Sequence, residues 1–379
     1  MTQIFIGLMS GTSLDGIDAI AIDLSSEPEI LATYYQPYNT ELRLQLHQLC
    51  QGCPDELRLY SELDHALGND FSDAANTVIK KAGLTTQQVC AIGSHGQTIR
   101  HYPNGNHPNS LQIGNPNIIA EQTGITTIAD FRRRDIAAGG QGAPLVPAFH
   151  NALFRSAKDD RIILNIGGIA NLTLLPADAG IPVSGWDTGP GNTLMNAWTL
   201  QHQQAPQDTD GRWATQGNSN QALLEAMLTD PYFHQTAPKS TGPEHFNLSW
   251  LGQHLAQHPD SLVNIQATLC ELTSQSIAMA IESGPLDNPE IFVCGGGSHN
   301  PLLMQQLHNK LTGKHIETTR KLGIDPDWVE AAAFAWLAQQ TLNGKAGNLP
   351  VVTGAHHERL LGSIYPGQSS NLAIEKYTG

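Results

Sequence analysis

The sequence predicts an α/β protein of two similar halves, and three observations lead to this fold class. The chain has 379 residues, enough for two domains that each bury their own core. Apolar runs of strand length alternate with stretches whose apolar residues recur at helical spacing. A pattern of apolar strand, glycine-containing turn and returning strand begins at Gln3 and recurs from Arg161, which we interpret as an internal repeat. We expect an N-terminal domain over residues 1–157 and a C-terminal domain over residues 158–379, whose last segment stays with it or packs back on the first.

The composition is that of a globular protein with a strong negative charge. Hydrophobic residues make up 40% and charged residues 15%, and the formal net charge of −15 disfavours a nucleic-acid partner. Five scattered cysteines do not suggest a disulfide framework, and the pair Cys50 and Cys53 lacks the second pair that a zinc site needs. No basic region precedes the first apolar run, and no apolar stretch reaches the roughly 18 residues that span a bilayer. We therefore expect a cytoplasmic protein with no membrane partner.

The first hairpin is expected to hold a turn rich in hydrogen-bond donors. Residues 3–9 and 17–24 read as its strands, joined by the turn Ser10-Gly-Thr-Ser-Leu-Asp-Gly16. The glycines permit unusual backbone angles, and the hydroxyls and backbone N–H groups can surround a phosphate. It is not a Walker A loop, because no Gly-Lys-Ser/Thr follows. A plain turn at a sheet edge, with Asp15 only fixing that turn, is the alternative interpretation.

Strands and helices are expected to alternate through the rest of the first half. The spacing predicts strands at residues 30–38, 89–93, 110–114 and 126–130 and helices at residues 40–50, 57–81 and 117–123. The strand at 89–93 ends in a polar cluster that contains His95, Gln97 and Thr98. Ligands of α/β folds usually bind at such carboxyl ends of strands. For His95, a satisfied structural histidine is an equal alternative.

Three arginines follow the strand at residues 126–130 in an otherwise acidic chain. They precede a glycine-rich loop at residues 139–147, which two prolines stiffen. This placement favours binding of an anion or a carboxylate, with Arg132 as the candidate. A solvated run of charges is the alternative interpretation.

The second half carries two acidic candidates. The spacing predicts strands at residues 161–166, 172–175 and 290–294, helices at residues 193–202, 265–283 and 326–342, and short helices and loops over residues 203–260. Asp187 is expected to end a further strand, before a loop that glycines and a proline hold open. An Asp that only caps the following helix is the alternative. Glu330 lies in the first turn of its helix, where an acidic side chain also favours the positive helix end.

Three glycine-rich turns, at residues 11–16, 167–171 and 295–297, each follow an apolar strand. A nucleotide held between two similar domains needs this layout, with one hairpin from each half on the phosphates and a third turn against the adenosine. In this respect the sequence resembles the actin/Hsp70/sugar-kinase superfamily, whose two actin-like (ribonuclease H-like) domains flank a nucleotide and sugar cleft. Residues 6–18, 164–173 and 293–300 correspond to its first phosphate loop, second phosphate loop and adenosine motif.

A set of motifs that spans nearly the whole chain carries a closer resemblance. Together these motifs resemble the anhydro-N-acetylmuramic acid kinase family. They are Gly7-Leu-Met-Ser-Gly-Thr-Ser-Leu-Asp-Gly-Ile-Asp18, Ser94-His-Gly-Gln-Thr98, Asp130-Phe-Arg132, Gly140-Gln-Gly-Ala-Pro-Leu-Val-Pro147, Asn165-Ile-Gly-Gly-Ile-Ala-Asn171 and Asp187-Thr-Gly-Pro-Gly-Asn192. The resemblance implies that ATP phosphorylates O6 of 1,6-anhydro-N-acetylmuramic acid while water opens the anhydro bridge at C1. The product is N-acetylmuramic acid 6-phosphate, formed during recycling of the bacterial cell wall, and a homodimer is implied.

The resemblance also implies roles for individual residues. Asp187 is the expected base that activates the water, and Glu330 is expected to face the substrate near C1. Asp15 and Asp187 are candidates to hold Mg²⁺ through water. The residues expected to contact the sugar are Arg132, at its lactyl carboxylate, and His95, Gln97, Thr98, Asn171 and Asp187. The residues expected to bind ATP are Gly11, Thr12, Ser13, Leu14, Asp15, Gly16, Ile17, Asp18, Asn165, Gly167, Gly168, Gly295, Gly296 and Gly297.

Two other functions compete with this one. An ordinary amino-sugar kinase would phosphorylate without opening a ring, but its base would come from the first domain rather than from a loop such as Asp187-Thr-Gly-Pro-Gly-Asn192. An ATP-switched binding protein is the alternative from another class, and no appended peptide-binding or filament segment is evident. The rate of ATP turnover with and without sugar separates the classes.

Overall fold

The computed structural model describes residues 2–368, which divide into two compact units. Unit 1 contains the described residues up to Leu153 together with those from Trp328 onward, and unit 2 is Phe154–Asp327. The sequence places this boundary slightly later, after residue 157. The sequence assigns the helix at residues 326–342 to the C-terminal domain and leaves only the segment after it open, whereas helix α11 (Val329–Leu342) packs against strands of unit 1.

Unit 1 is built on one mixed sheet in the order β12-β6-β4-β1-β2-β3, with β5 paired to β4. The central strand β1 is antiparallel to β2 and parallel to β4, so the predicted first hairpin is confirmed. Strand β3 adds antiparallel to β2, and β6 adds parallel to β4. The bounds of the strands are β1 Ile4–Ser10, β2 Gly16–Asp23, β3 Glu29–Pro37, β4 Val89–Tyr102, β5 Asn109–Ile113, β6 Thr127–Ala129 and β12 Ser363–Tyr365.

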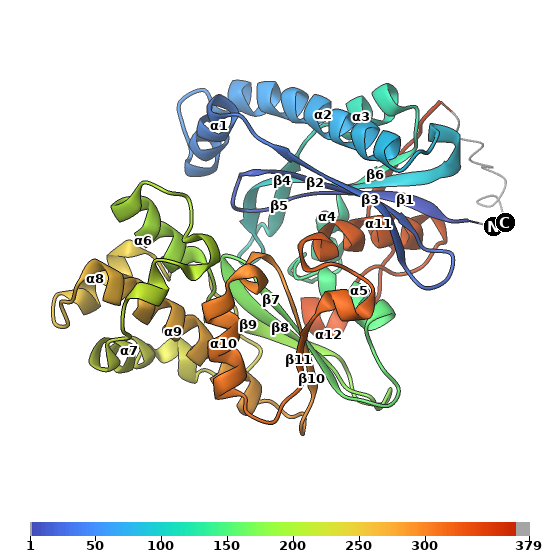
Figure 1. The fold of residues 1–379 in the computed structure, drawn as a ribbon. Helices are drawn as coiled ribbons and strands as arrows, with labels where there is room; N and C mark the ends of the chain where they lie inside the picture. Colours follow the sequence, from blue (N-terminus) through green and yellow to red (C-terminus); the bar gives the residue numbers. More distant parts are fainter. Residues whose placement is uncertain (1, 369–379) are drawn as a thin grey trace. The chain divides into compact units, whose positions relative to one another are not determined.

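Helices cover both faces of this sheet. Figure 1 shows α2 and α3 on one face and α11 on the other. Helix α11 lies unusually close to the strands, because a Cβ at Gly7 would stand 1.8 Å from the Ala331 carbonyl oxygen and one at Gly93 would stand 2.0 Å from that of Phe334. The helices of unit 1 are α1 Thr40–Gln51, α2 Glu56–Lys81, α3 Pro116–Thr123, α4 Phe131–Ala137, α5 Val146–Leu153, α11 Val329–Leu342 and α12 Pro350–Thr353.

Unit 2 repeats the strand order of unit 1. Its sheet runs β11-β10-β7-β8-β9, in which β7, β8 and β9 are successively antiparallel while β10 and β11 add parallel to β7. The same order and directions occur in β6-β4-β1-β2-β3, which confirms the internal repeat and the predicted pair of ribonuclease H-like sheets. The bounds are β7 Arg161–Ile166, β8 Ile169–Leu175, β9 Ser184–Pro190, β10 Glu290–Cys294 and β11 Ile316–Thr318.

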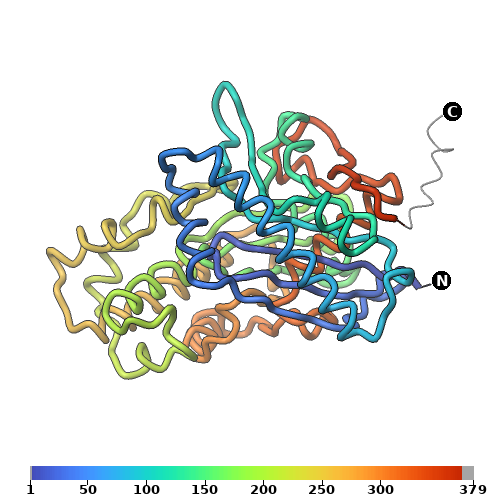
Figure 2. Tube along the Cα trace, turned by 90° about the horizontal axis from the view of Figure 1, so that it is seen from above, coloured from blue at the N-terminus to red at the C-terminus, as the bar shows by residue number. Residues whose placement is uncertain are grey.

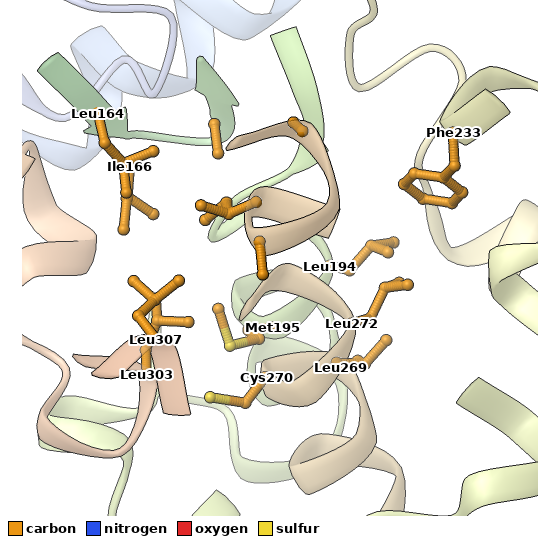
Figure 3. Close-up of a cluster of buried hydrophobic side chains, with 14 of the residues drawn as sticks. Leu164, Ile166, Leu194, Met195, Phe233, Leu269, Cys270, Leu272, Leu303 and Leu307 are labelled. Atoms are coloured by element: carbon orange, nitrogen blue, oxygen red, sulfur yellow. The ribbon is translucent and has the colours of Figure 1, made fainter. Parts of the chain in front are cut away.

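The core of unit 2 lies between its sheet and its helices. Figure 3 shows Ile166 of β7 directed toward Leu303 and Leu307 of α10, beside Met195 of α6. Burial of each such side chain contributes roughly 1.5–3 kcal/mol. The predicted short helices and loops of residues 203–260 are confirmed and can be followed in Figure 2. The helices are α6 Thr193–Gln203, α7 Gln221–Leu228, α8 Leu248–Leu255, α9 Leu262–Glu282 and α10 Pro301–Lys310.

The structure differs from the sequence prediction mainly at strand ends. The polar cluster of residues 94–98 does not follow a strand, because β4 continues to Tyr102 through a register shift near Gly96, whose φ is 74°. Asp187 lies inside β9 instead of ending a strand. The glycine turn from Gly295, which the sequence predicts to open a helix, leads into a 3₁₀ turn instead, and α10 begins only at Pro301. Across residues 2–368, no helix combines the length and the apolar character needed to cross a membrane.

Candidate active site

Buried side chains support the turn of the first hairpin, residues 10–16, through hydrogen bonds. The Ser10 hydroxyl lies 2.7 Å from the Gly16 carbonyl oxygen and 2.6 Å from Gln97 Oε1, and it accepts a hydrogen bond from Tyr38 Oη at 2.9 Å. The Gln97 amide donates to the Gly11 carbonyl at 3.0 Å. Gln97 is fully buried, so the structure places this predicted sugar ligand beneath the turn as one of its supports.

The same turn also carries exposed polar groups. Thr12 and Ser13 are exposed, and within residues 2–368 their backbone N–H groups donate to no protein acceptor. Asp15 is also exposed, and its Oδ1 accepts from the Ser13 hydroxyl at 2.8 Å. Leu14 has a positive φ of 54° and a buried side chain, which anchors the loop in the core. Ile17 is likewise a core residue, so the structure places the side chain of this predicted ATP ligand in the interior of unit 1.

His95 and Arg132 form a buried pair in unit 1. His95 Nδ1 lies 3.1 Å from the Ser10 carbonyl oxygen and can only donate to it, which leaves Nε2 as the acceptor for Arg132 Nε at 3.1 Å. A second guanidinium nitrogen, Nη1, donates to the Gly142 carbonyl at 2.8 Å. The glycine-rich loop after α4 therefore fixes the guanidinium whose role the sequence predicts.

Burial and charge set the protonation of this pair. Burial, reinforced by the Arg132 charge, lowers the pKa of His95 to about 3, so the imidazole stays neutral. Burial lowers the pKa of Arg132 to about 10, and the carboxylates of Glu330 and Asp135 oppose that shift. Glu330 belongs to the first turn of α11, as predicted, and α11 also places Phe334 4.7 Å from the His95 ring. The fold thus gathers His95, Arg132 and Glu330, whereas Thr98 lies on the β4–β5 ribbon and accepts from Gln112 Nε2 at 3.1 Å.

In unit 2, three predicted residues from separate motifs lie in one row across the sheet. Asn165 of β7 is paired with Asn171 of β8, which is paired in turn with Asp187 of β9. Residues opposite one another in antiparallel strands share a face, so these three side chains lie on the same side. A register shift beside Asn171 sets this alignment, and such bulges often re-aim side chains next to active sites.

Asp187 is held by a segment that the sequence does not connect with it. Its Oδ2 accepts from the Thr241 backbone N–H at 3.0 Å, and its own N–H donates to the Lys239 carbonyl at 3.1 Å. The Tyr232 hydroxyl donates to the Asp187 carbonyl at 2.7 Å. Burial raises the pKa of Asp187 to about 6, against the lowering effect of the Thr241 hydrogen bond and with help from the Glu244 charge.

The second glycine turn is hydrogen-bonded to neighbouring backbone, and the third packs closely against it. The carbonyls of Gly167 and Gly168 accept from the N–H groups of Asn192 at 2.8 Å and Gly191 at 2.9 Å. A Cβ at Gly295 would stand 2.3 Å from Asn165 Oδ1, and one at Gly297 would stand 2.3 Å from Ile166 Cγ2. The turn after β10 therefore packs directly on the end of β7, where the second loop begins.

The predicted site residues thus fall into two groups, one in each unit. Unit 1 brings together the first turn, His95, Arg132 and Glu330, while unit 2 brings together the second and third turns with Asn171 and Asp187. The sequence misses Tyr232, Lys239, Thr241 and Glu244 around Asp187, and its one signal there is the Lys-Ser-Thr-Gly-Pro-Glu run within residues 203–260. Within residues 2–368, no group of three or more His, Cys, Asp or Glu side chains is arranged to hold a metal ion.

Comparisons with known proteins place the chain in a family. The family model of anhydro-N-acetylmuramic acid kinase matches residues 3–367. The chain is 49% identical over 367 residues to the anhydro-N-acetylmuramic acid kinase of Coxiella burnetii (strain Dugway 5J108-111), covering 97% of this chain and 98% of that protein. It is 51% identical over 367 residues to the anhydro-N-acetylmuramic acid kinase of Shewanella sediminis, covering 96% and 99%.

Solved structures show a more distant similarity. One is the activator of the 2-hydroxyisocaproyl-CoA dehydratase from Clostridium difficile with bound ADPNP, at 12% identity and a TM-score of 0.42 over 91% of this chain and 96% of that one. Another is a ROK family glucokinase from Streptomyces griseus, at 13% identity and a TM-score of 0.37 over 88% and 99%. The family assignment rests on the sequence matches alone, and by these the chain belongs to the anhydro-N-acetylmuramic acid kinase family.

Proposed function

We propose that Asp187 is the base through which this chain performs its family's reaction. The chain is an ATP-dependent kinase of 1,6-anhydro-N-acetylmuramic acid in cell-wall recycling. Water adds to C1, the bond between C1 and O6 breaks, and O6 takes the γ-phosphoryl group of ATP, giving N-acetylmuramic acid 6-phosphate and ADP. The proton that the attacking water loses needs an acceptor, and a carboxylate within reach of that water is suited to accept it.

The observation that carries the proposal is the setting of Asp187. It stands in register with Asn171 and Asn165, which lie on either side of the second glycine turn along the chain. One of its oxygens is fixed by the Thr241 N–H, which orients the carboxylate. Its raised pKa, about 6, makes it a better proton acceptor than an ordinary aspartate while leaving it ionised at neutral pH.

The group formed by His95, Arg132 and Glu330 in unit 1 is suited to hold the sugar. Arg132 stays charged, and His95 and the Gly142 carbonyl fix its plane, so it can pair with the lactyl carboxylate of the substrate. His95 stays neutral and acts as a positioning residue for Arg132. We assign Glu330, whose charge acts on Arg132, to the C1 side of the sugar, as the resemblance implies.

The glycine turns are suited to hold ATP. The exposed N–H groups of Thr12 and Ser13 can bind phosphate oxygens, as can the backbone at Gly167 and Gly168. At Gly296 a Cβ would find its nearest atom at 4.0 Å, so a base or ribose can approach the backbone there. Asp15 is exposed and suited to hold Mg²⁺ through water, together with Asp187, and the ion would neutralise charge on the phosphates.

One experiment tests the coupled reaction. The chain is mixed with Mg-ATP and 1,6-anhydro-N-acetylmuramic acid in ¹⁸O-labelled water, quenched within one turnover and analysed by mass spectrometry. We expect one label at C1 and a phosphate at O6. Unlabelled product held in the same water for the same time controls for exchange at the anomeric carbon. Phosphorylation with the ring still closed would overturn the proposal in favour of an ordinary amino-sugar kinase.

The homodimer and the cytoplasmic location stay predictions. Sedimentation of the purified chain tests the first, since a homodimer has twice the mass of the 40.9 kDa chain. Fractionation of cells that produce the chain tests the second. A monomer at every protein concentration, or recovery outside the cytoplasmic fraction, would contradict the respective prediction.

A further inference from the structure

A small polar pocket in unit 1 shares His95 with the groups described above and extends to side chains outside them. Its volume is about 180 Å³, below the roughly 300–1,000 Å³ of pockets for drug-sized ligands. The side chains that matter for its chemistry are Tyr60 and Asp64 of α2, Ser94 of β4, Asp130 and Arg133 at the start of α4, and Tyr365 of β12. They come from four separate parts of the chain, so the fold and not one local turn creates the pocket.

The Ser94 side chain and the His95–Arg132 pair lie on opposite faces of β4. His95 and Gly93 face α11, since His95 stacks on Phe334 and a Cβ at Gly93 would meet the Phe334 carbonyl oxygen. Side chains alternate along a strand, so Ser94 faces the other side, where α2 lies. His95 and Gly96 also line the pocket, so it adjoins the His95–Arg132 pair at β4, while the Ser94 side chain lies on the other face.

Hydroxyl groups in this pocket lack partners. Ser94 is 1% exposed, and its hydroxyl hydrogen-bonds to no atom of residues 2–368. Buried hydroxyls are nearly always hydrogen-bonded, because burying one without a partner costs free energy. The phenol oxygens of Tyr60 and Tyr365, on either side of the pocket, make no hydrogen bond within the described chain either, and their rings add apolar surface. A ligand with several hydroxyls would satisfy all three.

The charged side chains in the pocket already have partners within the protein. Arg133 and Asp130 form a two-point ion pair, with N···O distances of 2.7 Å for both contacts. The two oxygens of Asp64 accept from the Gly114 N–H and from Asn115 Nδ2, both at 2.9 Å. An anion would find no unneutralised cation among the lining side chains and would meet the carboxylate of Asp64.

We propose that this pocket binds a neutral, hydroxyl-rich molecule no larger than a monosaccharide. The unpartnered Ser94 hydroxyl, the two phenols, the pocket volume and the balanced charges together define this class. A molecule bound there touches Arg133 and Asp130, which flank Arg132 along the chain. The pocket shares His95 with the Arg132 pair, but the class of its ligand does not depend on the proposed roles of Asp187 and Arg132.

The test measures binding of D-glucose as the neutral probe and glucose 6-phosphate as the anionic probe. Saturation-transfer NMR on the full chain gives a Kd for each, in the wild type and in Ser94→Ala, Tyr365→Phe and Tyr102→Phe. Tyr102 is an exposed tyrosine of unit 1 outside the pocket, so Tyr102→Phe is the matched control. We expect millimolar glucose binding that weakens about fivefold in Ser94→Ala and in Tyr365→Phe, as loss of a hydrogen bond predicts, and is unchanged in Tyr102→Phe.

The remaining outcomes would overturn the proposal. Glucose could fail to bind, or the phosphorylated probe could bind more tightly. Glucose could also bind with the same Kd in Ser94→Ala and Tyr365→Phe while Asp187→Asn abolishes binding, which would place it at the kinase site. Thermal unfolding of each variant verifies that it is folded. None of these results bears on the ring-opening assay, so failure here and failure of the proposed function are distinguishable.

Discussion

The two glycine hairpins share a topology but are held in different ways. In unit 1, side chains support the turn: Gln97 and Tyr38 bind beneath it, and Arg43 Nε donates to the Leu14 carbonyl at 3.1 Å. In unit 2, backbone N–H groups support the turn, since Gly191, Asn192 and Thr193 donate to the carbonyls of residues 167 and 168. The sheets on either side of these turns have the same strand order.

This difference shows that two turns of the same fold can be sensitive to different substitutions. A turn held by side chains fails when a supporting side chain is removed, even one far away in the sequence. A turn held by backbone tolerates many side-chain changes and fails when the backbone itself is displaced. The two hairpins differ also in chemistry, because the unit 2 sheet places Asp187, a carboxylate of raised pKa, beside its turn.

The largest expected effect tests that chemical difference. Asp187→Asn should lower turnover on the order of 10³-fold, because an amide cannot accept the proton from water. In this variant, the steady-state rates of ring opening and of ATP consumption should fall by the same factor. In the wild type, kcat/KM should decline as the pH drops through about 6, where Asp187 gains its proton. Retention of near-normal turnover by Asp187→Asn would place the base elsewhere.

The same variant should also be more stable at neutral pH. The pKa of Asp187 is raised from 3.8 to about 6, so between these values the folded state binds more protons than the unfolded state. Stability therefore falls as the pH rises through this window, and the cost is complete above it. Asp187→Asn removes this cost, which we put at about 1–2 kcal/mol after discounting for partial exposure. Urea unfolding at pH 7 and at pH 4 measures it, and an equal effect at both would contradict the assignment.

The next largest effect tests the backbone hydrogen bonds that support the second turn. In Gly191→Ala, the new Cβ would stand 2.4 Å from the Gly167 carbonyl oxygen and 3.1 Å from the Ala170 nitrogen, both backbone atoms that cannot swing away. We expect a loss of roughly 2–4 kcal/mol in unfolding free energy and a raised KM for ATP. Gly11→Ala is the matched control for stability, since its Cβ would have 3.8 Å to the Ser13 hydroxyl. Equal destabilisation by both would disprove the contrast.

A second pair of variants compares the side-chain supports of the two turns. Gln97→Leu removes the side-chain donor to the Gly11 carbonyl and one of the three partners of the Ser10 hydroxyl, so we expect about 1–3 kcal/mol of destabilisation and a severalfold higher KM for ATP. Asn192→Ala removes only the 3.2 Å bond from its side chain to the Ile166 carbonyl, while its backbone N–H still holds the second turn. Its KM for ATP should change little. Equal KM changes in the two variants would show that the hairpins are held alike.

The smallest effect concerns the surroundings of Asp187. Glu244 is exposed, and its charge raises the pKa of Asp187, so Glu244→Gln should move the acidic limb of kcat/KM to lower pH by a few tenths of a unit. Added salt should reduce the difference from the wild type. Glu225→Gln, on the exposed side of α7, is the charge-matched control. A limb that does not move would remove Glu244 from the site.

The sequence predicts the site more completely in its glycine turns than around Asp187. Strand, turn and strand are local patterns, so both hairpins could be located from spacing alone. The sequence also identifies Asp187, but not Thr241 or Tyr232, because the contacts between them join residues about fifty positions apart through no periodic pattern. Gln97 shows the opposite case: it is predicted as a ligand of the sugar, yet its place under Gly11 follows from β4 continuing as a strand past residue 93.

The sequence by itself determined the α/β class, the internal repeat, the glycine turns and the family of this protein, because these depend on residue type at short spacing. Tertiary structure decided which partner each polar group has. The neutral state of His95, the fixed plane of Arg132, the raised pKa of Asp187 and the unpartnered hydroxyl of Ser94 all depend on burial and on neighbours distant in the chain. Desolvation and hydrogen bonding act through space, and only the folded chain brings those neighbours within reach.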